Sequence, residues 1–305
     1  MKLAFCQHAN RRMGVAVAIG VAIASAVASG QSHAKETNFE GIRIEVVGKG
    51  KPVFMIPGLN SSSEVWTETC AALQPQVQCH IVNLPGFAGV PAVEADSYVS
   101  GMRDRLLRYA DQNKLKHASV IGHSLGGELA LMMAIKEPKR FEQIVVVDAL
   151  PFFGGVRNPK ATSDDVKPMA EQMRAGMLAS DDATYKAQAR MYLAGMSNQK
   201  ERMDTLAKWG DTSDRKTTAQ AMYELTVTDL RPELTQVKTP TLVLGAWASY
   251  AQYGATKDSV RATFDTQYAT LDGVKIELSE GGYHFLMWDD AAWLQGQVRR
   301  FLALK

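Results

Sequence analysis

The feature that most constrains the fold is a G-x-S-x-G motif, Gly122-His123-Ser124-Leu125-Gly126. A strand-like apolar segment at 118–121 precedes it, and helical spacing over 125–135 follows. A serine on a sharp strand-to-helix turn needs small neighbours, because larger side chains would clash with the adjacent backbone. The helix start also directs amide groups toward developing negative charge. We therefore expect the Ser124 hydroxyl to be a nucleophile at the carboxyl edge of a parallel sheet.

Short apolar segments alternate with helical patterns along the rest of the chain. Strands are expected at 42–47, 52–56, 80–84, 118–121, 144–147, 241–244 and 275–278. Helices are expected up to residue 73 and at 97–113, 125–135 and 289–304. Strands that alternate with helices predict an α/β fold, in which helices flank a mostly parallel central sheet.

No convincing strand occurs between residues 150 and 240. Helical spacing is present at 166–178, 183–195 and 217–226, and a structureless loop of this length would be implausible in a compact domain. We therefore expect a helical insertion over 151–235, between core segments 35–150 and 236–305. The segment holds half of the 14 methionines. Methionine suits variable apolar ligands and also fills gaps in a core, so both roles remain open.

Residues 1–34 have the pattern of a secretory signal peptide. Lys2, Arg11 and Arg12 form a basic start, an apolar run over 13–28 follows, and small residues precede position 35. The apolar run is shorter than the about 20 residues that a membrane span requires. We expect cleavage of this segment, a periplasmic or secreted mature protein, and no stable membrane association after signal removal.

Removal of the signal changes the charge and the cysteine count. The net charge of +2 minus three basic residues gives −1, which is not the footprint of a nucleic-acid-binding protein. Cys6 is lost with the signal, and Cys70 and Cys79 remain. They lie near the end of an expected helix and the start of an expected strand. They could form a disulfide in an oxidising compartment, or they could be two small buried apolar residues.

Four motifs, spread over about residues 40–303, resemble those of the α/β-hydrolase family. Residues 55–59 resemble the loop that supplies an oxyanion-hole amide, and residues 83–89 resemble the segment that follows it, with Asn83 in place of an Asp. Residues 122–126 form the strand-to-helix turn around the serine, called the nucleophile elbow, and residues 282–285 resemble the loop that carries the catalytic histidine. The resemblance implies a helical cap inserted after the sixth strand, at 151–235. It also implies a serine hydrolase that needs no metal and no organic cofactor.

A serine nucleophile needs a base within hydrogen-bond reach. After signal removal the histidines are His80, His117, His123 and His284. The first two begin strands at the opposite end of the sheet, and His123 is expected to point away from the serine. His284 follows a strand in a glycine-rich loop, so we predict that it is the general base.

Backbone amides are expected to form the oxyanion hole. Acyl transfer needs donors aimed at the oxygen of the tetrahedral intermediate. The amides of Leu59 and Leu125 are the natural candidates, because Leu59 lies in the oxyanion-like loop and Leu125 directly follows the nucleophile.

A serine hydrolase of this kind also needs an acid that orients the histidine and completes a catalytic triad. The sequence offers two candidates for this acid. Most relatives place it three residues after the glycine that corresponds to Gly245, where this chain has Ala248. Asp148 ends the strand over 144–147 at the same sheet edge and is the favoured candidate, with Asp258 as the alternative. The chain order of serine, acid and histidine holds for either.

The remaining candidates concern the pocket. Trp247, Tyr250, Phe152 and Phe153 flank the expected site and suit an apolar acyl or aryl group. Glu128, one turn into the elbow helix, is either a hydrogen-bonded group close to the site or a partly exposed helix carboxylate.

We expect an exported serine esterase that acts on small to medium, largely apolar carboxylic esters. Its partner would be a small-molecule ester and not a nucleic acid. An amidase, a lactonase or a thioesterase would use the same triad. A homologue that binds a ligand without turnover is the alternative from another class, because position 248 lacks the acid.

Overall fold

The computed structural model contains one eight-stranded sheet, whose strand order is β1-β2-β4-β3-β5-β6-β7-β8. Its strands are β1 Lys35–Phe39, β2 Ile42–Gly48, β3 Lys51–Ile56, β4 Val77–Asn83, β5 Ser119–His123, β6 Ile144–Val147, β7 Thr241–Gly245 and β8 Lys275–Leu278. β1 and β2 run antiparallel to their neighbours, and β3 to β8 pair in parallel. The expected mostly parallel α/β sheet is therefore confirmed.

The structure describes Met1 and residues 35–305. Apart from Met1, the signal peptide expected at 1–34 lies outside the described residues. Within the described part of the chain, no helix is both long enough and apolar enough to span a bilayer.

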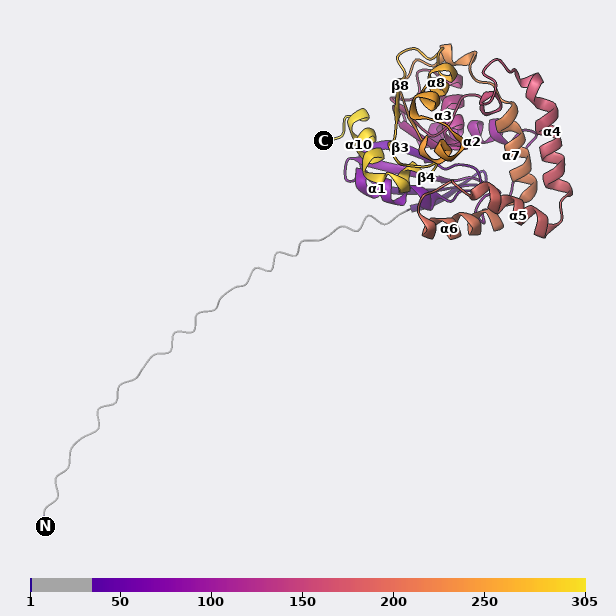
Figure 1. Cartoon of the computed structure of the whole chain (residues 1–305). Coiled ribbons are helices and arrows are strands. Elements are labelled where there is room, and N and C mark those ends of the chain that lie inside the picture. The colour runs from indigo at the N-terminus through magenta and orange to yellow at the C-terminus, as the bar shows by residue number, and fades with distance from the viewer. Residues whose placement is uncertain (2–34) are drawn as a thin grey trace. The chain divides into compact units, whose positions relative to one another are not determined.

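Helices cover both faces of the sheet (Figure 1). They are α1 Thr67–Leu73, α2 Tyr98–Gln112, α3 Leu125–Lys136, α8 Lys257–Gln267, α9 Leu286–Asp289 and α10 Ala291–Phe301. Alternate side chains of a strand point to opposite faces. Val146 accordingly packs in the core under α2, α3 and α8, and Val147 packs in the core under α1, α9 and α10. β5 and β6 are buried along their whole length because both faces are covered.

The register of β5 and β6 determines where the site forms. Gly122 pairs with Val146 and His123 with Val147, so both strands end at the same level. The residues that follow them, Ser124 and Asp148, therefore emerge side by side at the carboxyl edge of the sheet.

Four helices follow the sixth strand, and no strand occurs among residues 151–235, all of which the structure describes. They are α4 Ser163–Ala179, α5 Asp182–Leu193, α6 Lys200–Asp211 and α7 Arg215–Val227. α4 packs against α7, and α5 packs against α6. Met191 on α5 is 78% exposed, so it does not fill a core. We refer to residues 151–235 as the insertion.

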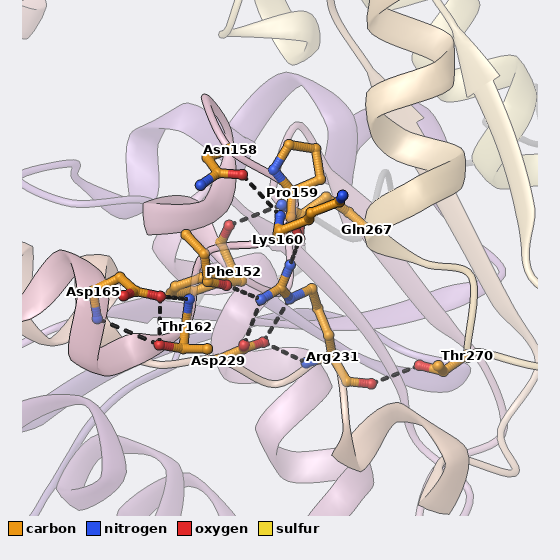
Figure 2. Close-up of polar contacts among 11 residues, drawn as sticks. Phe152, Asn158, Pro159, Lys160, Thr162, Asp165, Asp229, Arg231, Gln267 and Thr270 are labelled. Atoms are coloured by element: carbon orange, nitrogen blue, oxygen red, sulfur yellow. Dashed lines mark hydrogen bonds and ion pairs between the residues drawn. The ribbon is translucent and has the colours of Figure 1, made fainter.

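Arg231 ties together the two ends of the insertion (Figure 2). Its guanidinium donates to the carbonyl oxygens of Pro159 and Ala161, both at 2.6 Å, on the segment that leaves the core. It also pairs with Asp229 on the returning segment at 2.6 Å and lies 4.5 Å from the centre of the Phe152 ring. Charged, partly buried hydrogen bonds of this kind are strong, so the junction is well defined.

Cys70 and Cys79 form a disulfide with an S–S distance of 2.11 Å. It joins α1 to β4, and both residues are buried. Of the two alternatives for this pair, the structure has the bridge.

Candidate active site

The backbone of Ser124 has φ 52° and ψ −120°, in a region that non-glycine residues rarely adopt. The glycines around it make this turn possible. A Cβ atom on Gly122 would lie 2.0 Å from the Gly126 carbonyl oxygen, and a Cβ on Gly126 would lie 2.2 Å from the Ile56 carbonyl oxygen. Strain of this kind persists only where the surroundings hold it, and it clusters at functional sites.

Hydrogen bonds fix the turn to the sheet and to α3. The Ser124 N–H donates to the Val147 carbonyl oxygen at 2.9 Å, and the Ser124 carbonyl accepts the Gly127 N–H at 2.8 Å. α3 begins at Leu125, and the first amides of a helix have no partner within it. The predicted oxyanion donor Leu125 therefore lies at a helix N-terminus beside the serine.

The loop after β3 lies directly against the nucleophile. A Cβ atom on Gly58 would be 3.0 Å from the Ser124 Cβ, so the loop that contains Leu59 passes close to the serine. Asn60 has φ 56°, and its Oδ1 accepts a hydrogen bond from the Thr218 hydroxyl of α7 at 2.7 Å. The loop that holds the second predicted oxyanion donor is thus linked to the insertion.

Asp148 and His284 are in direct contact. His284 Nδ1 donates to Asp148 Oδ2 at 2.6 Å, and the Ala246 N–H donates to Asp148 Oδ1 at 2.8 Å. The Asp148 side chain is 7% exposed and the His284 side chain is 20% exposed. A proton held on Nδ1 leaves Nε2 of the neutral ring as an acceptor. Asp258 lies exposed in the first turn of α8, so of the two acid candidates only Asp148 is brought to His284.

His123 does not point away from the site, and that expectation was wrong. It is buried, its Nε2 lies 3.0 Å from the His284 carbonyl oxygen, and the two rings are 4.5 Å apart. Burial lowers the pKa of His123 well below its ordinary value, so the ring is neutral. Since the carbonyl can only accept, His123 Nε2 carries the proton and donates it. The middle position of the motif carries no signal from which this orientation could be predicted.

The insertion also holds the histidine loop. The Phe285 N–H donates to the Met196 carbonyl at 3.2 Å. Asp289 accepts the Ser197 hydroxyl at 2.6 Å and the Tyr283 N–H at 3.1 Å. Burial raises the pKa of Asp289 above its ordinary value. These contacts fix the segment on either side of His284.

The four predicted pocket residues have different surroundings. Trp247 is half-buried at the start of the 3-10 helix Ala248–Tyr253. Tyr250 is 48% exposed and lies within electrostatic reach of Asp148. Phe153 is exposed, whereas Phe152 is fully buried beneath Arg231. Contact of these residues with substrate stays a prediction.

Glu128 is buried, so the alternative of a partly exposed helix carboxylate was wrong. It is 1% exposed, and its Oε1 has no hydrogen-bond partner among the described residues. Within the same part of the chain, no group of three or more His, Cys, Asp or Glu side chains is arranged to hold a metal ion.

Comparison with known proteins agrees with this geometry. The α/β-hydrolase fold family matches residues 51–290. A pimeloyl-acyl-carrier-protein methyl ester esterase of Nitrosomonas europaea is 28% identical over 210 residues, which are 67% of this chain and 79% of that protein. A hydrolase of Pseudomonas aeruginosa superposes with a TM-score of 0.73 at 15% identity, over 88% of this chain and 98% of that one. An enol-lactonase of Burkholderia xenovorans gives a TM-score of 0.70 at 16% identity, over 88% and 100%. Because the family match spans most of the chain, this protein belongs to the α/β-hydrolase fold family.

Proposed function

We propose that this protein is an exported serine esterase in which Ser124, His284 and Asp148 form the catalytic triad. The observation that carries the proposal is the 2.6 Å contact between His284 Nδ1 and Asp148 Oδ2, at the sheet edge where the strained Ser124 emerges. Membership of the α/β-hydrolase family and the esterase among its relatives support an ester-cleaving hydrolase.

In the first half of the reaction, the Ser124 hydroxyl oxygen attacks the ester carbonyl carbon and passes its proton to His284 Nε2. Asp148 holds the ring in the required tautomer and stabilises the imidazolium that forms. The amides of Leu59 and Leu125 stabilise the negative charge on the carbonyl oxygen. The C–O bond to the leaving group then breaks, and the alcohol departs with the proton from His284.

In the second half, water attacks the acyl-serine carbonyl, and His284 takes one proton from that water. The tetrahedral intermediate collapses, the proton returns to the Ser124 oxygen, and the carboxylic acid leaves. One ester and one water thus give one acid and one alcohol. The enzyme returns to its starting state without a cofactor.

The insertion acts as a cap over this site. Thr218 bonds the oxyanion loop through Asn60, and Ser197 bonds the histidine loop through Asp289. Trp247, Tyr250, Phe152 and Phe153 contribute to a site for small to medium, largely apolar acyl or aryl groups. Methyl esters are included among the candidate substrates because a relative is named for one.

The proposal places the mature protein in the periplasm or outside the cell, without stable membrane association. The basic start, apolar run and small residues of 1–34 support export. The Cys70–Cys79 disulfide supports an oxidising compartment.

A fluorophosphonate probe and a series of p-nitrophenyl esters test the activity on the purified mature protein. We expect the probe to label the wild type and not Ser124→Ala, and we expect turnover of esters with short to medium chains. A matched control, Ser180→Ala, changes a half-buried serine at the end of α4, whose hydroxyl donates to the Gly176 carbonyl of the same helix. Absence of labelling, with no difference between wild type and Ser124→Ala on any ester, would support the ligand-binding homologue instead. The Asp148–His284 contact weighs against that alternative, because it supplies the carboxylate that position 248 lacks.

A further inference from the structure

Glu128 lies one turn beyond Ser124 on α3 and is closed off from solvent. Its N–H donates to the Ser124 carbonyl at 3.1 Å, so the two residues belong to the same helical turn. Only 1% of its surface is exposed. Glutamate is rarely buried to this extent without a partner, so the position calls for an explanation.

The polar groups around Glu128 are already engaged elsewhere. Glu224 of α7 interacts electrostatically with Glu128, but its carboxylate accepts two backbone amides at the start of α2, at 2.7 and 2.9 Å. The hydroxyl of Tyr268, also within electrostatic reach, donates to the Ala149 carbonyl at 2.8 Å. Among residues 35–305, Glu128 Oε1 has no hydrogen-bond partner. One oxygen of this buried carboxyl group is therefore left without a partner by the described residues.

The charge state of Glu128 restricts what that ligand can be. Burial raises the pKa of this carboxyl group well above its ordinary value, and the charge of Glu224 raises it further. A buried carboxyl group without a cationic partner favours its neutral form, which is a carboxylic acid with an O–H donor. A carboxylic acid kept neutral in an apolar site donates a hydrogen bond to an oxygen atom and does not bind a cation.

We propose that Glu128 is a specificity-determining residue that donates a hydrogen bond to an oxygen atom in the acyl chain of the ester. This inference rests on the proposed esterase function. The acyl chain would enter the junction between α3 and α7, which begins one helical turn, about 5.4 Å, from Ser124. The preferred substrates are therefore esters whose acyl chain carries an ether, keto or hydroxyl oxygen several bonds from the scissile carbonyl.

Pairs of p-nitrophenyl esters of equal chain length test this proposal. One member has a plain hexanoyl chain, and the others have one methylene replaced by an ether oxygen at successive positions. The measured quantity is the ratio of kcat/KM for the ether ester to kcat/KM for the alkyl ester. Glu128→Met removes the donor at similar length, Glu128→Gln keeps an N–H donor, and Glu171→Met is the matched control on an exposed face of α4.

We expect the wild-type ratio to exceed that of Glu128→Met by about tenfold for at least one ether position, as the loss of one buried hydrogen bond implies. Glu128→Gln should retain most of the preference, and Glu171→Met all of it. Equal ratios in the wild type and Glu128→Met at every position would overturn the proposal. If Glu128→Met does not fold, a wild-type ratio near one at every position would overturn it as well. A wild type that cleaves none of the esters would instead overturn the proposed function, and this inference with it.

Discussion

Replacing Asp148 with asparagine tests whether this residue is the acid of the catalytic triad, because it changes one carboxylate oxygen to an NH₂ group. Asp148 Oδ1 accepts the Ala246 N–H at 2.8 Å, and Oδ2 accepts His284 Nδ1–H at 2.6 Å. In Asp148→Asn only one of these two positions can be occupied by an oxygen. The backbone amide of Ala246 always donates, so the asparagine carbonyl must face it, and the NH₂ group must face His284.

This arrangement inverts the tautomer of His284. An NH₂ group donates, so Nδ1 must accept, and the ring proton moves to Nε2. Nε2 can then no longer take the proton of Ser124. A wrong tautomer of this kind costs about 10⁴-fold in kcat, which corresponds to about 5.4 kcal/mol of transition-state stabilisation. The fold should be retained, because both hydrogen bonds are still made.

The assay is steady-state hydrolysis of a short p-nitrophenyl ester at neutral pH, combined with thermal unfolding of each variant. Asp258→Asn is the matched control, because Asp258 is an exposed aspartate on α8, and its kcat should equal that of the wild type. Asp148→Ala should be less stable than Asp148→Asn by about 1–3 kcal/mol, since it leaves the buried Ala246 amide unpaired. A folded Asp148→Asn whose kcat falls by less than tenfold would refute the role of Asp148.

Three further predictions address residues around the site and the core. His123→Phe keeps an aromatic ring but loses the hydrogen-bond donor to the His284 carbonyl. Because such a hydrogen bond is worth about 1 kcal/mol, kcat should fall by up to about tenfold with little change in KM. An unchanged kcat would contradict a role of His123 in positioning His284. Burial lowers the pKa of His80 from 6.5 to about 4. The folded state then binds fewer protons than the unfolded state below pH 6.5, and the free energy of unfolding should fall by about 2 kcal/mol between pH 7 and pH 5. Urea unfolding should show this loss in the wild type and in His117→Asn, which changes an exposed histidine, but not in His80→Gln. The disulfide joins residues nine positions apart. The double variant Cys70→Ala with Cys79→Ala should therefore have a free energy of unfolding lower by about 3 kcal/mol. An unchanged urea denaturation midpoint would count against the bridge.

Local steric rules account for the features that could be predicted from the sequence. The elbow was predictable because Gly122 and Gly126 are required by backbone atoms within 2.0 and 2.2 Å of their missing Cβ positions. β6 was predictable because four consecutive β-branched residues suit a strand that is covered on both faces. β1 was missed, since Lys35–Phe39 is a largely exposed edge strand without an apolar pattern. α6 and α8 were also missed, because much of each helix surface is polar.

The identity of the acid depends on strand order, which sequence spacing does not contain. Asp148 and Asp258 both lie between the nucleophile and the histidine in the chain, so chain order could not separate them. β6 lies between β5 and β7, and Val147 pairs with Leu244. This register brings Asp148 beside Ala246 and into reach of the loop after β8. Asp258 lies instead on an exposed helix surface.

The insertion has a structural role at the site that its composition did not reveal. One of its hydrogen bonds, from Thr218 to Asn60 at 2.7 Å, holds the loop of the predicted oxyanion donor Leu59. Another, from Ser197 to Asp289 at 2.6 Å, holds the loop that carries His284. These loops lie on opposite sides of Ser124 in the chain and contact the same insertion. Because both hydrogen bonds come from the same insertion, a movement of the insertion would alter the Leu59 loop and the His284 loop together.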